Sequence, residues 1–179
     1  MRTTNSTRLT FCVLAIALPL SSVTAGEFST VINGKSFHIG ASQEWNEANY
    51  GLGVEYTFKR DSRWKPQLMA NGFRDSNEDM SYMVGGGLHR NLYTTDRLNG
   101  FYFDAGINAF VMTRSDVNDE KPFPGVLPSL TVGNRYVGMN LTYMPKVAVE
   151  EMYDGKIADE SMSGIVFLQF KINVSQLMD

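Results

Sequence analysis

Apolar residues recur at every second position over long stretches of this chain. The pattern is clearest in 101–112, where odd positions are apolar and even positions are mostly polar or small. The odd positions are Phe101, Phe103, Ala105, Ile107, Ala109 and Val111, and the even ones include Tyr102, Asp104, Gly106 and Asn108. The same alternation runs through Tyr50–Lys59 and Val137–Met144. A period of two indicates β-strands with one apolar face and one polar or glycine-rich face.

Eight such runs are expected, with ends placed to within about two to four residues. They lie near 35–45, 50–59, 65–75, 80–89, 100–112, 124–134, 137–145 and 162–172. They predict an all-β fold, an eight-stranded antiparallel up-and-down transmembrane β-barrel. A soluble periplasmic sandwich or lipocalin-like barrel is the alternative, but glycine-rich faces suit a crowded lumen better than a water-facing surface.

Barrel topology then places the loops. If the chain begins and ends on the periplasmic side, strands one, three, five and seven run outward. The external loops are expected near 45–50, 74–80, 113–124 and 146–161. The periplasmic turns are expected near 60–64, 90–99 and 134–136.

The first 25 residues have the pattern of a secretory signal. Arg2 and Arg8 precede the ten-residue apolar run Phe11–Leu20, and small residues lead to an expected cut between Ala25 and Gly26. The run is too short for a membrane helix, which needs about 20 residues. We therefore expect 1–25 to be a cleaved signal peptide and 26–179 to form one barrel domain in a bacterial-type outer membrane.

Charge and cysteine content narrow the chemistry. The single cysteine, Cys12, lies inside the expected signal, so the mature chain has no thiol chemistry. Without Arg2 and Arg8, 14 basic residues stand against 19 acidic ones, a net charge of −5. This balance gives no support for nucleic-acid binding. We expect a monomer with no metal and no cofactor.

The chain has two histidines, and they differ in their expected position. His38 lies on the first run, where alternation turns Ser36 and His38 inward and Phe37 outward. It can meet the polar loop at Asp75 and Ser76. His89 closes the fourth run on the periplasmic side, too far along its strand to act on Ser76. A histidine that takes a proton from a hydroxyl, beside a carboxylate, is typical of acyl transfer, but spacing alone is a weak signal.

Glycines and prolines suggest two further features. Inward glycines recur at Gly40, Gly51, Gly53, Gly85, Gly87, Gly106 and Gly138. They either leave lumen space for a narrow ligand such as an acyl chain or permit tight strand curvature. Pro128 and Pro145 fall in the outer halves of adjacent strands, where each removes a ladder donor. They predict a weak seam in the wall that could pass a lipid sideways, unless they simply sit at strand ends.

Two stretches resemble a known family. NGFRDSNEDMSYMVGGGLHR (71–90) resembles the aromatic–basic–Asp–Ser hairpin and following glycine-bearing strand of the lipid A palmitoyltransferase PagP family. VLPSLTVGNRYVGMNLTYMP (126–145) resembles its proline-to-proline segment. With gaps, the resemblance covers roughly 36–170.

The resemblance implies roles for six residues. His38, Asp75 and Ser76 match the family's catalytic residues. Gly87 matches the glycine at the floor of its acyl-chain pocket, and Pro128 and Pro145 match its lateral lipid gate. The implied reaction moves an acyl chain, usually palmitate, from a glycerophospholipid donor to a hydroxyacyl chain of a lipid A acceptor.

The sequence also departs from the family. About a dozen residues separate the expected cleavage site from His38, too few for the family's N-terminal amphipathic helix and a strand start. The first external loop is shorter, and the chain continues beyond its last aromatic residue, Phe170. Two other functions stay open, a non-enzymatic barrel of the adhesin or resistance type and a lipid A deacylase.

Overall fold

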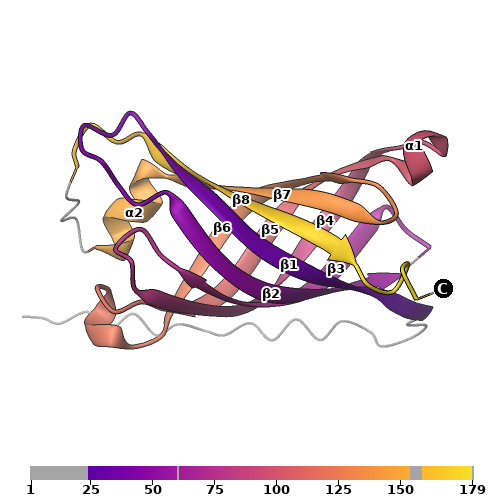
Figure 1. Ribbon diagram of the computed structural model, residues 1–179, viewed down its shortest axis with the longest axis horizontal. Coiled ribbons are helices and arrows are strands. Elements are labelled where there is room, and N and C mark those ends of the chain that lie inside the picture. The colour runs from indigo at the N-terminus through magenta and orange to yellow at the C-terminus, as the bar shows by residue number, and fades with distance from the viewer. Residues whose placement is uncertain (1–23, 60, 154–158, 179) are drawn as a thin grey trace, which may run out of the picture.

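The computed structural model describes residues 24–59, 61–153 and 159–178 and forms a closed barrel of eight antiparallel strands (Figure 1). The strands are β1 (Thr24–Ile39), β2 (Ala48–Lys59), β3 (Trp64–Arg74), β4 (Met80–Thr94), β5 (Tyr102–Thr113), β6 (Phe123–Gly133), β7 (Val137–Pro145) and β8 (Gly164–Asn173). Each strand pairs with its sequence neighbours, and β1 pairs with β8. The predicted fold class is therefore confirmed. No helix in the described ranges has the length and apolar character needed to span a membrane.

The barrel is apolar outside and polar inside. Large apolar side chains such as Leu52, Val84 and Ile107 are exposed on the outer surface. Buried polar side chains fill much of the interior, among them Glu55, Asn71, Asp104, Thr131 and Lys171. This distribution is the reverse of a soluble barrel, and it fits a wall in contact with lipid. The soluble alternative is wrong for this reason.

The register predicted for 101–112 is confirmed. Ile107 is 56% exposed and Val111 is 46% exposed, whereas the intervening Phe110 is buried. Asn108 points into the lumen, where its side chain bonds Gln67 and Ser129. A slip of one residue would have exchanged every one of these faces.

The first strand differs from its prediction. It runs over Thr24–Ile39 rather than 35–45, and the residues after Ile39 form a loop. A break in register after Asn33 explains the error, because Val31 and Asn33 face inward before it and Ser36 faces inward after it. The irregularity shifts the alternation by one residue and hides the early half of the strand. Residues 26–37 are strand and not helix. The predicted signal peptide lies almost wholly in 1–23, outside the described residues.

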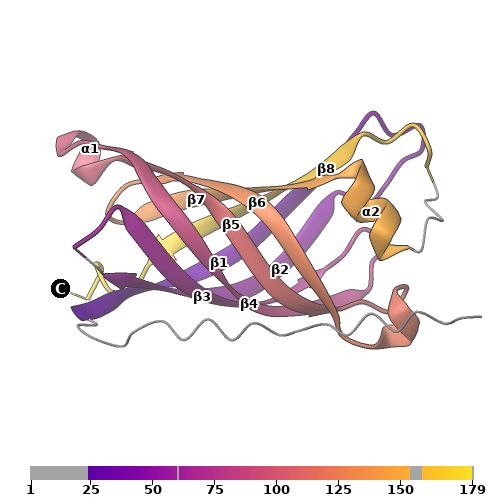
Figure 2. The same cartoon turned by 180° about the vertical axis from the view of Figure 1, so that it is seen from behind.

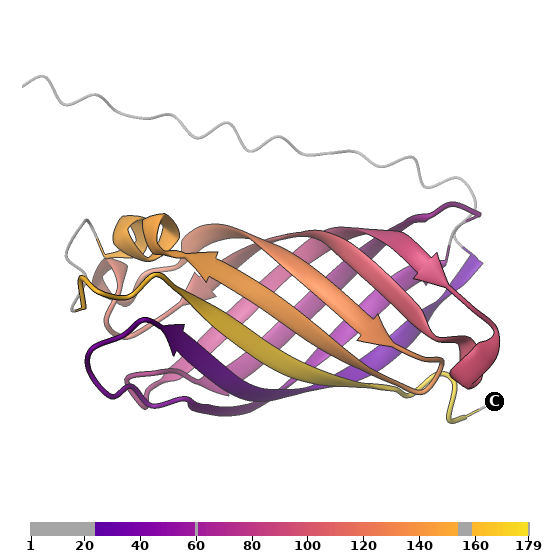
Figure 3. The same ribbon diagram turned by 90° about the horizontal axis from the view of Figure 1, so that it is seen from above.

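The two ends of the barrel differ in their loops (Figures 2 and 3). One end carries the start of β1, the C-terminal segment and short connections, including α1 (Arg97–Gly100). The other end carries 40–47, 75–79, 114–122 with the short 3-10 turn η1 (Asn118–Glu120), and the described residues 146–153 and 159–163. Because outer-membrane barrels have short periplasmic turns and longer external loops, the second end is the external one.

Helix α2 (Lys146–Met152) was not foreseen in the fourth external loop. It begins directly after Pro145 and buries Val149 almost completely. Val149 and Met152, three positions apart, face the same side of the helix and line the lumen cavity. The helix therefore packs against the external end of the barrel, where Figure 1 shows it beside the strand ends.

The ladder between β6 and β7 is incomplete. Pairing runs from Gly133↔Gly138 to Ser129↔Thr142 and stops there, while β6 pairs with β5 along its whole length. Pro128 is the first β6 residue beyond the last pair. The external halves of β6 and β7 are thus not joined to each other, as the predicted seam required.

Inward glycines do not leave empty space. A Cβ on Gly87 would collide with the Asn108 side chain, one on Gly106 with His89, and one on Gly53 with Asn71. Side chains of adjacent strands already fill the space beside these three glycines, and at Gly51 and Gly85 the backbone of the neighbouring strand lies equally close. Gly40 is a different case, because it lies in the turn after β1 at φ +75°. The interpretation that glycines open the lumen is therefore wrong for Gly51, Gly53, Gly85, Gly87 and Gly106, where the neighbouring strand approaches closely.

Candidate active site

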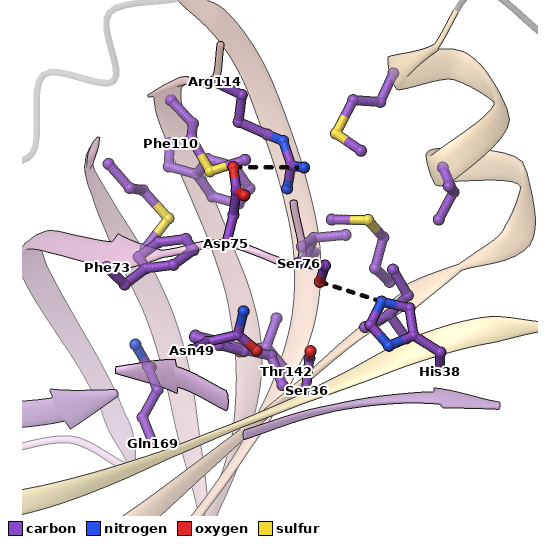
Figure 4. Close-up of a pocket in the computed structure, with 18 of the residues that line it drawn as sticks. Ser36, His38, Asn49, Phe73, Asp75, Ser76, Phe110, Arg114, Thr142 and Gln169 are labelled. Atoms are coloured by element: carbon purple, nitrogen blue, oxygen red, sulfur yellow. Dashed lines mark hydrogen bonds and ion pairs between the residues drawn. The ribbon is translucent and has the colours of Figure 1, made fainter. Parts of the chain in front are cut away.

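His38 and Ser76 meet at the external end of the lumen. The Ser76 hydroxyl oxygen lies 3.2 Å from His38 Nε2 (Figure 4). His38 is inward-facing near the end of β1, and Ser76 belongs to the tight turn between β3 and β4. The structure thus brings together two residues 38 positions apart in the sequence.

Asp75 lies beside Ser76 but its carboxylate holds the turn rather than the histidine. It is 1% exposed. Its Oδ1 accepts the backbone N–H groups of Asn77 and Asp79, and its Oδ2 accepts the Ser81 hydroxyl at 2.8 Å. A carboxylate that accepts several bonds within one turn fixes the conformation of that turn. Asp75 therefore positions Ser76.

Arg114 was missed by the sequence reasoning. Its guanidinium lies 3.5 Å from Asp75 Oδ2 and 2.9 Å from Asp116, and donates to the Tyr153 hydroxyl at 3.1 Å. One nearly buried cation thus joins the second, third and fourth external loops. Only Asp116 lies nearby in the sequence, and the other two partners, Asp75 and Tyr153, are distant from it, so the local sequence does not mark Arg114 as a link between loops.

The charges around Arg114 shift the ionisation of its neighbours. Burial alone would raise the pKa of Asp116, but hydrogen bonds from Arg114 and Tyr153 and the Arg114 charge hold it below its usual value. Burial raises the pKa of Tyr153, and so does its hydrogen bond to Asp116. Asp116 is therefore charged and Tyr153 neutral near pH 7. Arg114 and Asp116 form an ion pair, and the neutral Tyr153 hydroxyl donates a hydrogen bond to Asp116.

A further contact fixes the first external loop against this turn. Asn46 donates to the backbone carbonyl of Asp75 at 3.2 Å, and Asn49 donates to that of Arg74 at 2.9 Å. The Trp45 ring stacks on His38 with 5.2 Å between ring centroids. This shorter loop therefore contributes directly to the placement of both Ser76 and His38.

Below His38 and Ser76 lies an apolar cavity of about 130 Å³ inside the barrel. Aromatic and aliphatic side chains such as Phe73, Phe110 and Leu127 line it, with Phe167 from β8. Six methionines add to the lining: Met69, Met83, Met112, Met144, Met152 and Met162. Methionine is unbranched and adapts its shape, so this lining suits a flexible hydrocarbon ligand.

A polar layer closes the cavity from below. His89 Nε2 lies within hydrogen-bond distance of Gln67, Asn108 and Ser129, at 3.0–3.2 Å. Asn108 lines the cavity floor. Gly87 lies in this layer, against Asn108 and Gln67, and does not itself line the cavity. Asn108 therefore lies between Gly87 and the cavity.

His89 is not at the strand end as predicted. β4 continues to Thr94, which leaves His89 buried inside the lumen. It lines a second, polar cavity in the periplasmic half, away from Ser76. Lys171–Glu55 and Lys65–Asp104 ion pairs occupy the same half. Pro145, the other predicted gate residue, ends β7 beside α2.

The described side chains offer no obvious metal site. Within the part of the chain that the structure describes, no three His, Cys, Asp or Glu side chains are grouped closely enough to hold an ion. The groups available for chemistry at the external end are the His38 imidazole, the Ser36 and Ser76 hydroxyls and the nearby Asp75 carboxylate.

The fold and site define an outer-membrane β-barrel with an apolar lumen cavity capped by a His–Ser pair. The sequence profile of the PagP family, described as antimicrobial peptide resistance and lipid A acylation protein, matches residues 14–158. The chain belongs to this family.

Individual relatives give the same family. The chain is 30% identical over 106 residues to a lipid A acyltransferase PagP of Bordetella pertussis, which covers 58% of this chain and 55% of that protein. It is 30% identical over 103 residues to the protein of the same name from Methylobacillus flagellatus, and 31% identical over 103 residues to that from Laribacter hongkongensis. These matches span 53% and 48% of the two relatives. The chain thus matches about half the length of these curated relatives.

Proposed function

We propose that this protein is a lipid A acyltransferase that moves an acyl chain, palmitoyl or similar, from a glycerophospholipid to a hydroxyacyl chain of lipid A. The observation that carries the proposal is the 3.2 Å contact between His38 Nε2 and the Ser76 hydroxyl at the mouth of an apolar cavity. The relatives named lipid A acyltransferase support the same reaction class.

The reaction exchanges one ester for another. The acceptor hydroxyl oxygen attacks the ester carbonyl carbon while its proton passes to His38 Nε2, directly or through Ser76. The tetrahedral intermediate collapses by breaking the bond to the glycerol oxygen, which takes the proton back from His38. The products are an acylated lipid A and a lysophospholipid. One ester forms and one breaks, so the reaction needs no cofactor.

The seam between β6 and β7 provides a lateral entry for the donor chain. Pro128 lies where the two strands separate, and Leu127 and Met144 line the cavity beside it. Unpaired backbone at membrane depth is costly unless something uses or covers it. A phospholipid tail in the outer leaflet could pass between β6 and β7 without leaving the membrane. The protein works as a monomer in this scheme.

Two other functions are disfavoured. A non-enzymatic adhesin or resistance barrel would use its outer loops, and it would need neither a His–Ser contact nor an apolar cavity below it. A deacylase would hand the acyl group to water, whereas the relatives that match this chain are named lipid A acyltransferases.

The direct test is mass spectrometry of lipid A from cells with and without the protein. An added mass equal to one acyl chain supports the proposal. Loss of an acyl chain from lipid A would indicate the deacylase, and unchanged lipid A alongside a correctly inserted barrel would favour the adhesin.

A further inference from the structure

Buried polar atoms without partners are concentrated in one place. Among the described residues, four buried side-chain polar atoms lack a hydrogen-bond partner: Ser36 Oγ, His38 Nδ1, Trp45 Nε1 and Asn49 Oδ1. All four residues line the apolar cavity. Native proteins leave few such atoms unpaired, because each costs its full desolvation penalty. Their grouping around His38 indicates that a ligand satisfies them.

The chemistry of these atoms identifies the ligand group. The Trp45 indole can only donate, and the Ser36 hydroxyl can donate. Asn49 uses its amide nitrogen on the Arg74 carbonyl, so its free oxygen accepts. Two free donors beside a general base match the carbonyl oxygen of an ester, which gains negative charge as the ester is attacked.

The geometry places both donors beside the reacting histidine. Ser36 is two residues before His38 on the same inward face of β1 and is 3% exposed. Figure 4 shows its hydroxyl pointing into the cavity toward Ser76, with His38 alongside. Trp45 stacks on the His38 ring with an interplanar angle of 15°. The Ser76 hydroxyl is already engaged with His38 Nε2, so it is not a free donor.

We propose that the Ser36 hydroxyl and the Trp45 indole N–H donate hydrogen bonds to the carbonyl oxygen of the donor ester and stabilise its oxyanion during transfer. This assignment rests on the proposed acyltransferase function. It gives the cavity mouth two distinct parts, a proton-transfer pair (His38 and Ser76) and an oxyanion site (Ser36 and Trp45).

Two variants each remove one donor and keep the shape. Ser36→Ala deletes only the hydroxyl, and Trp45→Phe deletes the N–H while keeping an aromatic ring on His38. We expect each to lower kcat by about 10²-fold, the usual effect of losing one oxyanion donor, with little change in KM. The assay uses the refolded full chain in detergent micelles with dipalmitoyl phosphatidylcholine as donor and lipid A as acceptor.

Stability separates this role from a structural one. Because the Ser36 hydroxyl has no partner in the structure, Ser36→Ala should unfold at the same temperature as the wild type or higher. Thr131→Val is the matched control, since it also deletes one buried hydroxyl, but that hydroxyl donates to Asn140 at 2.8 Å. It should lower the unfolding temperature and leave kcat unchanged.

The outcomes are distinguishable. If the wild type transfers no acyl group, the proposed function fails and this assignment fails with it. If the wild type is active and both Ser36→Ala and Trp45→Phe keep full kcat, the oxyanion site is wrong and the proposed function stands. An unfolding temperature of Ser36→Ala lowered as far as that of Thr131→Val would show that the hydroxyl holds the fold, and would also overturn the assignment.

Discussion

The Ser76 hydroxyl lies 3.2 Å from His38 Nε2, although the two residues belong to different external segments of the barrel. This contact predicts that His38→Ala and Ser76→Ala each fold normally and lose lipid A acylation. The expected loss of general-base catalysis is about 10²–10⁴-fold in kcat. Transfer of a labelled acyl chain to lipid A measures it. Full activity in His38→Ala would remove the main support for the enzyme.

His89→Ala is the control for that pair, because it removes the other histidine. His89 bonds Gln67, Asn108 and Ser129, so its loss leaves buried partners unsatisfied and costs about 1–3 kcal/mol of stability. Activity per folded molecule should remain. An inactive but folded His89→Ala would contradict the assignment of His38 as the base.

Arg114 holds three external loops with one side chain, so its shape matters as well as its charge. Arg114→Lys keeps the charge but cannot reach Asp75, Asp116 and Tyr153 together, since an ammonium lacks the fork of a guanidinium. We expect kcat to fall by up to about 10²-fold through misplacement of Ser76. Arg135→Lys, an exposed change at the periplasmic end, should leave kcat unaltered. Equal rates for the two variants would show that Arg114 does not position the site.

The sequence predicts the strands of the barrel wall better than it predicts the candidate active site. Side-chain alternation predicts seven of the strands and their faces, because contact with lipid imposes a strict period of two. It misplaces β1, where the register break after Asn33 shifts the period. The resemblance, rather than spacing, directs attention to His38 and Ser76. Arg114 escapes notice because two of its partners, Asp75 and Tyr153, are distant in the sequence. Trp45 escapes notice because its stacking on His38 depends on how the first external loop folds back toward β1. Helix α2 escapes notice because its apolar face is only a few residues long.

Gly87→Met should shorten the acyl chain that the protein transfers. A side chain at this position meets Asn108, which forms the cavity floor, so either the new side chain or the displaced Asn108 must rise into the cavity. Each methylene that no longer fits loses about 0.8 kcal/mol. Competition between phosphatidylcholines of different chain length measures the shift. Val84→Met, on the lipid-facing side of the same strand, should leave the preference unchanged, and an identical product distribution in both variants would rule out this floor.

Asp159 joins the first and fourth external loops, and this link depends on pH. Hydrogen bonds from Ser161, and from Ser42 and Gln43 of the first loop, lower the pKa of its carboxyl. Because the folded-state pKa lies below the unfolded value of about 3.9, the link is at full strength above that pH. It weakens as the pH falls through the folded-state pKa.

Amide hydrogen exchange tests this link. Asp159→Ala should speed exchange at Ser42 and Gln43 near neutral pH, because both amides donate to the Asp159 carboxylate. The difference from the wild type should shrink in strongly acidic solution, where the wild-type carboxylate is also protonated. Glu160→Ala, the adjacent acidic residue, should have no such effect. Unchanged exchange in Asp159→Ala at neutral pH would show that the two loops are held by other contacts.

The seam between β6 and β7 predicts a reversible block. Continuing the register beyond Ser129↔Thr142 by one pair would set Pro128 opposite Tyr143, and both side chains face outward. A disulfide between Pro128→Cys and Tyr143→Cys would hold the strands together there without filling the cavity, since cysteines on facing strands can approach within bonding distance. If donor lipid enters through this gap, the oxidised variant should lose acyl transfer and regain it on reduction.

A matched disulfide between Leu130→Cys and Leu141→Cys joins residues that are already paired, so it should leave transfer unchanged in either state. Mature chains carry no other cysteine if the expected cleavage removes Cys12, and counting free thiols reports how much of each bridge has formed. Full activity of the oxidised Pro128→Cys, Tyr143→Cys variant, with its thiols shown to be bridged, would exclude the seam as the entry and require the donor chain to enter elsewhere.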